Sequence, residues 1–545
     1  MHMLCRLVLT LTVFSQGIFA AEMDQKINKP DTRPNVVLIL VDDLNDYQGI
    51  FGGHPQAKTP NIDKLAESGV RFSNAHSNVP VCQPSRNSMF TGVYPHRSKD
   101  FGWEAHYKIK GLKDNKTLVE RFNETGYYTL GTGKLLHSER QNLWQKWGMN
   151  RNHNYGPFYF DGETMGAVPT VPTPYSDIGA VDGGYGRLSD VGQSTGEKDA
   201  IGWVYGWDKK PFRYVNDNNR SKTQDELHAQ WAIQQLEQLA RQENKPPFFM
   251  GVGFVRPHTP LYAPDRFFDL FPLNSLIIPP WLAGDNGDTF LKNNIAADSK
   301  GLNYYKQLLA SYKGDREIAI KHFLQAYLAC ISFVDEQIGK VLNQLDSHPK
   351  LRDNTIVVFT SDHGWQMGEK NYLFKNSPWE ESTRIPLIIR LPGNPHNGRQ
   401  VAHPVSLIDI YPTLADYVQF SANHQKSNQA LPLGGHSLRA FLENPATQMW
   451  QGPNGALSII GNFGGSMKEW RPAKQTYSYR TKNWRYIRYA NGQEELYDHQ
   501  NDPYEWHNLA YQPKNQPVKV KLRRQINEII GEELEVSDVT SITVQ

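Results

Sequence analysis

The stretch Asn35-Val36-Val37-Leu38-Ile39-Leu40-Val41 decides the fold class of this 545-residue chain. Six of its seven residues are apolar, and it lacks the polar–apolar alternation of a half-exposed strand. Such a run is typical of a central strand that is covered on both faces in a parallel sheet. The runs Phe248–Phe254 and Asn354–Thr360 have the same character. We therefore predict an α/β protein built on a mainly parallel sheet.

Titratable side chains follow each of these three strands. Asp42-Asp43 come directly after the first, His258 lies shortly beyond the second, and Asp362-His363 follow the third. The carboxyl ends of parallel strands converge on one crevice of an open sheet, so we expect these groups to meet there. Adjacent carboxylates beside a buried strand repel one another unless a cation or hydrogen-bond donors neutralise them. Asp-Asp pairs are common in solvated loops, but the matching Asp362 favours a metal site.

Cys82 stands just ahead of a predicted helix start, in the sequence Val81-Cys82-Gln83-Pro84-Ser85-Arg86-Asn87-Ser88-Met89-Phe90-Thr91-Gly92. Free backbone N–H groups and the helix dipole favour an anion at such a position. Cys330 instead falls on a helical pattern of apolar residues and is expected to be a small core residue. We predict no disulfide bond between Cys82 and Cys330.

The pattern Cys-x-Pro-Ser-Arg followed by Thr-Gly resembles the signature of the type I sulfatases. Three further motifs are most similar to the iduronate 2-sulfatase branch: Gly133-Lys134-x-x-His137, Arg256-Pro257-His258 and Ser361-Asp362-His363-Gly364-Trp365. This resemblance covers nearly the whole mature chain. It implies an alkaline-phosphatase-like sandwich with a large mixed, mainly parallel central sheet and a smaller C-terminal subdomain that contains an antiparallel sheet. It also implies that a maturation enzyme oxidises Cys82 to formylglycine.

The same resemblance implies a calcium site and a set of catalytic residues. The calcium ion is expected among Asp42, Asp43, Cys82, Asp362 and His363. His363 departs from the wider family, where an amide is usual, and imidazole is a poor partner for a hard cation. The hydrated aldehyde formed from Cys82 is the implied nucleophile. The other implied catalytic residues are Arg86, Lys134 and Lys375, which would hold the sulfate, His258, which would protonate the leaving oxygen, and His137, which would accept a proton as sulfate is released.

Residues 1–21 predict a cleaved secretory signal, because Arg6 precedes an apolar run over Leu7–Phe14 and Ala20-Ala21 stand before the polar Glu22. The mature protein is therefore expected in the periplasm or outside the cell. No later run is predicted to span a membrane, and a net charge of +2 provides no general attraction for nucleic acid. We predict a catalytic domain over residues 22–420, a polar linker over 421–430 and a C-terminal subdomain over 431–545. The subdomain is expected to contain aromatic strands (475–480, 484–489 and 494–497) and a final helix (518–534).

The expected substrate is a sulfated oligo- or polysaccharide. The insertion 148–222, which is rich in Gly, Tyr, Asn and Asp, is long for a loop and is predicted to be a lid or binding wall. Further substrate contacts are predicted for Glu104, His106, Lys108 and Trp365. Two other functions stay open at this point. One is a phosphate or phosphonate ester hydrolase, because the same cations would hold a phosphoryl group, and the other is a secreted, non-catalytic carbohydrate-binding protein.

Overall fold

The structure is a computed structural model that describes residues 32–138, 140–149, 155–192, 201–243, 245–291, 299–420, 423–460 and 471–536. The predicted signal 1–21 lies outside these residues. The chain from Pro34 onward forms one compact unit. The predicted division between residues 22–420 and 431–545 stays a prediction.

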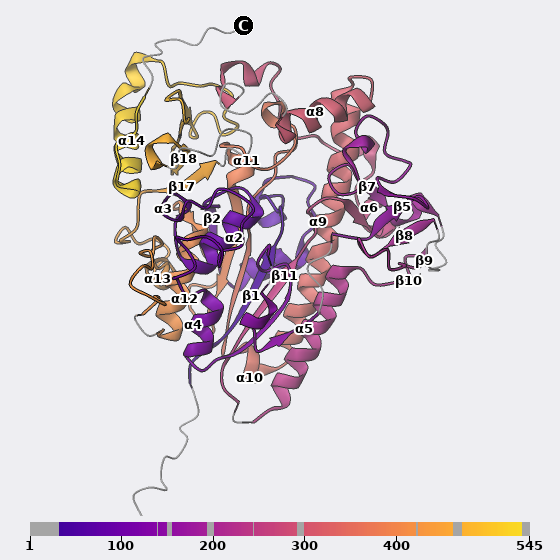
Figure 1. Ribbon diagram of the computed structural model, residues 1–545, viewed down its shortest axis with the longest axis horizontal. Coiled ribbons are helices and arrows are strands. Elements are labelled where there is room, and N and C mark those ends of the chain that lie inside the picture. Colours follow the sequence, from indigo (N-terminus) through magenta and orange to yellow (C-terminus); the bar gives the residue numbers. More distant parts are fainter. Residues whose placement is uncertain are drawn as a thin grey trace, which may run out of the picture. The chain divides into compact units, whose positions relative to one another are not determined.

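A nine-stranded mixed sheet forms the centre of this unit (Figure 1). β13, β1, β11, β3 and β4 run parallel to one another, whereas β14 is antiparallel to both β13 and β2. The prediction of a mixed, mainly parallel sheet is therefore confirmed. Its strands lie in the order β15 (Gln400–Val401), β2 (Val70–His76), β14 (Arg384–Arg390), β13 (Thr355–Ser361), β1 (Asn35–Val41), β11 (Phe248–Phe254), β3 (Tyr128–Gly133) and β4 (Lys146–Trp147), and β16 (Val405–Ser406) also pairs with β2.

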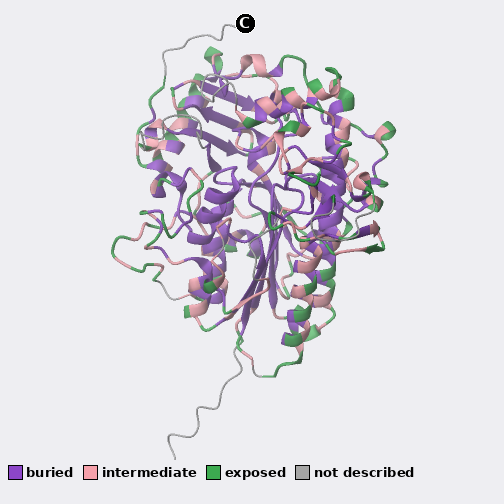
Figure 2. Cartoon of the chain, turned by 45° about the vertical axis from the view of Figure 1, so that its right-hand side comes forward, coloured by how far each residue is buried: buried purple, intermediate pink, exposed green. Residues whose placement is uncertain are grey.

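Strand β1 is buried along its whole length because the sheet is covered on both faces (Figure 2). Val37, Ile39 and Val41 belong to a core that includes side chains of α1 (Pro60–Glu67), α5 (Gln224–Arg241) and α9 (Arg316–Asp346). The alternate residues Val36, Leu38 and Leu40 belong to a second core, with α2 (Cys82–Thr91), α4 (Leu118–Glu124) and α12 (Ile410–Val418). Burial of both faces explains the unbroken apolar sequence. Two helix starts are capped, since Thr117 and Thr223 each form a capping box with the Glu three residues later.

Helix α9 corrects one prediction about membrane segments. By length and composition this helix contains an apolar window of 18 residues that would be able to cross a bilayer, although no such run was predicted. In the structure 78% of that apolar window is buried inside the protein. A core helix packed on a sheet needs apolar residues around much of its circumference, so its composition alone does not distinguish it from a membrane span.

The C-terminal part contains the predicted antiparallel sheet. β18 (Thr476–Thr481), β19 (Trp484–Arg488) and β20 (Glu494–Asp498) match the three aromatic segments, and α14 (Gln516–Ile530) matches the final helix. β17 (Gly455–Ile460), which pairs with β18, was not predicted. The apolar spacing of residues 405–417 predicts a helix over this whole range, but α12 begins only at Ile410 because β16 and a short 3-10 turn come first.

The insertion 148–222 is more structured than predicted. Its described residues include short strands, and Tyr175 and Trp203 are buried in the main core. Part of the insertion is therefore a packed wall rather than a loose lid.

The remaining strands of the described residues are β5 (Phe158–Phe160), β6 (Met165–Gly166), β7 (Tyr185–Arg187), β8 (Gly202–Val204), β9 (Tyr214–Asn216), β10 (Asn219–Arg220) and β12 (Leu261–Ala263). The remaining helices of these residues are α3 (Pro95–Ser98), α6 (Asp265–Phe268), α8 (Lys300–Ser311), α10 (Pro349–Arg352), α11 (Glu380–Thr383) and α13 (Arg439–Glu443).

Candidate active site

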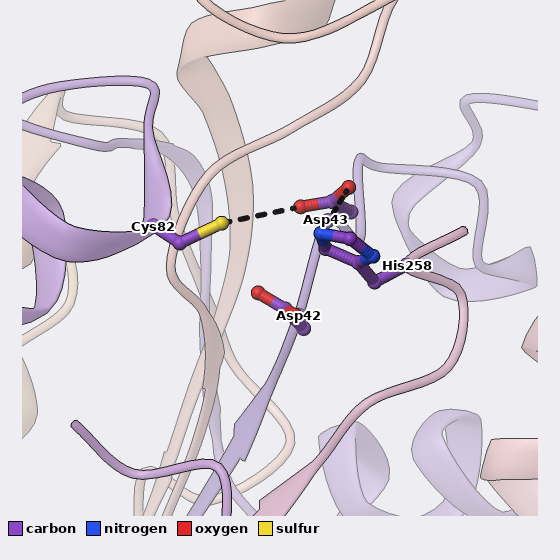
Figure 3. Close-up of side chains that lie close together, drawn as sticks. All are labelled: Asp42, Asp43, Cys82 and His258. Atoms are coloured by element: carbon purple, nitrogen blue, oxygen red, sulfur yellow. Dashed lines mark hydrogen bonds and ion pairs between the residues drawn. The ribbon is translucent and has the colours of Figure 1, made fainter. Parts of the chain in front are cut away.

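The predicted site residues meet at the carboxyl ends of the central strands. Val41, the last residue of β1, pairs with Phe254 of β11 and with Ser361 of β13, so the segments that follow these strands leave the sheet at one level. Figure 3 shows Asp42, Asp43, Cys82 and His258 pointing toward one another from β1, α2 and the segment after β11. The shared register brings these groups together at the strand ends, as the strand pattern predicted.

Cys82 is the first residue of α2 and is almost fully buried. Its Sγ lies 3.0 Å from Lys375 Nζ, 3.2 Å from His363 Nε2 and 3.8 Å from Asp43 Oδ1. Burial and the Asp42 carboxylate raise the pKa of the thiol, but Lys134, Lys375 and His363 together outweigh them, so the pKa is lowered from its ordinary value. Cations surround the sulfur, and an anion at this position is stabilised.

Asp42 and Asp362 are held by cationic side chains. Arg86 bridges the two carboxylates, with Nη2 3.1 Å from Asp42 Oδ1 and Nε 2.8 Å from Asp362 Oδ2. Lys134 Nζ donates to the other oxygen of Asp42. Burial raises the pKa of Asp42, but Lys134 and its neighbouring cations prevail and hold this pKa well below its usual range.

Lys134 reaches the site through a turn that requires glycine. Gly133, the last residue of β3, has φ 77°, and a Cβ atom there would lie 1.8 Å from the carbonyl oxygen of Gly253. No side chain fits in that contact. The motif Gly133-Lys134 therefore has a structural reason in addition to the chemical one.

Asp43 is held in a strained conformation beside the thiol. Its φ of 60° is unusual for a residue other than glycine. Tyr327 OH donates to its carbonyl oxygen at 2.7 Å, and its own N–H donates to Asp362 Oδ1 at 3.2 Å. Lys375 Nζ lies 2.7 Å from Oδ1. Burial, helped by Cys82 and Asp42, nevertheless outweighs Lys375 and raises the pKa of Asp43 well above its usual range.

The donor set fits a hard divalent cation in part. One ligand atom each from Asp42, Cys82, Asp362 and His363 lies within 4.8 Å of the others, and Asp43 belongs to a second such group with His258. Three buried carboxylates suit calcium, which prefers oxygen ligands, whereas sulfur and imidazole nitrogen do not. A hydrated aldehyde at position 82 would replace the sulfur with oxygen and would complete the set.

The two histidines beside Asp43 each present Nε2 to the site. Because a carbonyl can only accept, His258 Nδ1 donates to Thr259 O at 2.6 Å and His363 Nδ1 donates to Gly364 O at 3.0 Å. Burial and Lys375 lower the pKa of His258 well below its ordinary value. Burial also opposes the charge on His363, but Asp362, Cys82 and Asp43 raise its pKa to about 9. Without a bound cation, these shifts favour the neutral form of His258 and the protonated form of His363 near pH 7.

His137 lies at the rim rather than among the acids. Its ring is 5.1 Å from that of Trp103, which is 52% exposed. Burial and Lys134 lower the pKa of His137 to about 3, so the neutral ring is able to accept a proton. His137 lies three residues after Lys134, whose charge acts on its ring, and its catalytic role stays a prediction.

The four predicted substrate contacts divide into two pairs. Glu104 and Lys108 are exposed and line a groove next to Trp103. His106 is buried, and Trp365 packs in the core against Phe374 at 5.2 Å between ring centroids. The burial of His106 and Trp365 argues against the predicted contact with a sugar, and both side chains serve packing instead.

Sequence reasoning missed two residues of the insertion that reach the site. Lys134 Nζ donates to Tyr155 OH at 3.1 Å, and the ring of Tyr155 lies 4.4 Å from that of His258. Asp182 accepts from Thr259 Oγ1 at 2.9 Å, next to His258, and from Lys300 Nζ at 3.0 Å. The only signal for either residue was the abundance of Tyr and Asp in an insertion without periodicity.

The family model for sulfatases matches residues 34–420, and the model for the C-terminal part of N-sulphoglucosamine sulphohydrolase matches residues 368–532. The chain belongs to the sulfatase family. A curated "Sulfatase" of Formosa agariphila is 31% identical over 496 residues, which cover 89% of this chain and 85% of that protein. Human iduronate 2-sulfatase is 27% identical over 437 residues, which cover 74% and 72% of the two chains.

A solved structure shares the fold of this sulfatase. The structure of BT4656 in complex with its substrate D-glucosamine-2-N,6-O-disulfate has a TM-score of 0.63 at 23% identity and covers 92% of this chain and 98% of that one. The predicted resemblance and the alkaline-phosphatase-like fold are therefore confirmed. The protein is a sulfuric ester hydrolase.

Proposed function

We propose that this sulfatase hydrolyses sulfate esters of a sulfated oligo- or polysaccharide, with formylglycine made from Cys82 by a maturation enzyme. The observation that carries the proposal is the position of Cys82. Its Sγ lies at a helix start, within 3.2 Å of Lys375 and His363 and within reach of Asp43. Hydrated formylglycine would supply the attacking oxygen and a second hydroxyl group from which sulfate can be released.

Arg86, Lys134 and Lys375 balance the charge of the site. Each contacts at least one of Asp42, Asp43 and Asp362, so three cations face three carboxylates. A bound calcium ion, held by these carboxylates and the modified Cys82, would supply the positive charge that attracts an anionic ester. Lys134 and Lys375 would then be able to contact sulfate oxygens. Preorganised cations of this kind stabilise charge without reorganisation during the reaction.

Two histidines are placed to move protons on different sides of the site. His258 presents Nε2 beside Asp43, and we assign it the protonation of the leaving sugar oxygen, which requires uptake of a proton at this atom. His137 is neutral at the rim and is assigned the proton that must leave the second hydroxyl. The pKa of each ring is lowered, which favours the neutral form of both histidines at neutral pH.

A carbohydrate substrate is supported by the rim and by relatives. Trp103, whose ring lies beside that of His137, and Tyr107 are exposed, and Tyr155 adds an aromatic wall beside His258. Aromatic faces of this kind pack well against sugar rings. The BT4656 structure holds a disulfated glucosamine, and human iduronate 2-sulfatase is named for a sugar sulfate. Export of the protein, which would bring it to such glycans, stays a prediction.

The test is release of sulfate by protein that has been produced together with a maturation enzyme. Sulfate is measured by ion chromatography for defined glycosaminoglycan, carrageenan and ulvan oligosaccharides, for an aryl sulfate and for a phosphonate monoester. Cys82→Ala, which cannot form an aldehyde, is the control. We expect release from at least one glycan with higher kcat/KM than for the aryl sulfate. Efficient aryl sulfate turnover without release from any glycan would contradict the carbohydrate assignment, and preference for the phosphonate would favour the alternative hydrolase.

A further inference from the structure

A basic groove adjoins the rim of the active site. The groove has a volume of about 700 Å³, and its lining includes Arg97, Lys99, Trp103, Glu104, Lys108 and Lys110. This volume falls within the range of roughly 300–1,000 Å³ that is typical of ligand sites. None of the catalytic residues described above lines it.

Three contacts fix this groove relative to the nucleophile. Gln83, the residue after Cys82, donates from Nε2 to the carbonyl oxygen of Glu104 at 2.8 Å, and Asn87 of the same helix donates to that oxygen at 3.0 Å. The ring of Trp103 lies 5.1 Å from the ring of His137. A sugar that leaves the sulfate pocket past His137 would therefore meet Trp103 and then the groove.

The groove carries an excess of positive charge. Four cations line it, Arg97, Lys99, Lys108 and Lys110, against the two acids Asp100 and Glu104. Among the residues that the structure describes, Lys99, Lys108 and Lys110 are exposed and have no carboxylate within ion-pair distance. Asp100 is buried and accepts from Asn87 Nδ2 at 2.8 Å, and burial raises its pKa to about 7. Lysines that share one groove without acidic partners repel one another, and an anionic ligand relieves that repulsion.

We infer that this groove binds a second anionic group, a sulfate or a carboxylate, on the sugar next to the one that is desulfated. The inference rests on the proposed function and narrows it, because the substrate is then a polyanionic glycan rather than one with an isolated sulfate. Trp103 provides the stacking face between the two anionic positions. Lys99 and Lys110 attract this second anionic group and so favour substrates whose neighbouring sugar is charged.

The experiment compares kcat/KM for three kinds of substrate. They are oligosaccharides whose neighbouring sugar is sulfated, carries a carboxylate, or is uncharged, with an aryl sulfate as the reference. Lys99→Gln/Lys110→Gln removes two charges of the groove. Lys514→Gln/Lys521→Gln removes two exposed charges elsewhere and is the matched control, and Lys99→Arg/Lys110→Arg tests rescue by charge.

The Gln variant of the groove is expected to lower the ratio of kcat/KM for the charged glycan to that for the aryl sulfate by about tenfold, mainly through KM. The control and the Arg variant should keep this ratio within about twofold. The kind of substrate for which this ratio falls, with a sulfated or a carboxylated neighbouring sugar, identifies the second anion. An unchanged ratio in the Gln variant, with an active parent protein, would overturn the groove assignment alone. Failure of the parent protein to desulfate any glycan would instead overturn the proposed function on which the inference rests.

Discussion

At the scale of single residues, the strand ends were predictable and the insertion was not. Asp42, Asp43 and Asp362 follow continuous apolar runs, so their convergence follows from the geometry of a parallel sheet. The roles of Lys134 and Lys375 came from resemblance, because a lone lysine in a loop has no distinguishing pattern. Tyr155 was missed because its contacts with Lys134 and His258 join segments far apart in the sequence. Such a contact leaves no periodic pattern of residues in the local sequence.

Removal of the Tyr155 hydroxyl should impair catalysis without unfolding the protein. Tyr155 OH accepts a hydrogen bond from Lys134 at 3.1 Å, and a bond to a charged donor contributes about 1.5–3 kcal/mol. Tyr155→Phe is therefore expected to lower kcat/KM by roughly tenfold or more, since 1.4 kcal/mol corresponds to a factor of ten. Tyr417→Phe is a matched control, because among the described residues the hydroxyl of Tyr417 has no hydrogen-bond partner. Equal effects of the two changes on kcat/KM would remove Tyr155 from the site.

At the scale of elements, continuous apolar strands and capping boxes were predictable, whereas sheet edges were not. β1, β11 and β13 are buried on both faces, which leaves an unbroken apolar run in the sequence. The antiparallel direction of β14 depends on its pairing with β2 and β13, which are distant in the chain. The start of α12 was also misplaced, because residues 405–418 keep a helix-like apolar spacing although β16 and a turn precede the helix.

Asp409, just before α12, should make stability depend on pH. Its carboxylate accepts from Ser406 N and His436 N, both at 2.8 Å, and burial raises its pKa to about 7. Because this pKa exceeds the unfolded value, the stabilising contribution is complete below about pH 4 and is lost as the pH rises through about 7. Asp409→Asn cannot ionise. The difference in Tm between this variant and the parent should therefore become more favourable to the variant from pH 5 to pH 8, as measured by calorimetry. A difference that stays constant with pH would show that Asp409 does not titrate in this range.

At the scale of the whole molecule, the residues that would bind the metal lie beside the nucleophile and also follow the central strands of the sheet. Metal binding should therefore affect both activity and stability. The acidic residues that would bind calcium directly follow β1 and β13, which are central strands of the sheet. A cation that binds only the folded protein stabilises it by RT ln(1 + [L]/Kd), about 2.7 kcal/mol at a hundredfold excess over Kd. We therefore expect chelation to lower both Tm and sulfatase activity, and calcium to restore both.

The control for this expectation is Asp43→Asn. Asp43 belongs to one of the two groups of possible ligand atoms, beside Asp42 and Cys82, so loss of its carboxylate should abolish the calcium-dependent rise in Tm. Magnesium, which demands a tighter octahedral site, should restore Tm less well than calcium does. A protein freed of divalent ions that kept its full Tm and activity would exclude the metal site.

The central claim is that an aldehyde formed from Cys82 carries the reaction. Mass spectrometry of the peptide that contains Cys82 measures the fraction of thiol converted to formylglycine, and sulfate release by the same preparation measures turnover. We expect the peptide mass to fall by the difference between a thiol-bearing carbon and an aldehyde. Across preparations made with increasing amounts of maturation enzyme, kcat should rise in proportion to the converted fraction. Full turnover by protein in which Cys82 remains an unmodified thiol would contradict the account.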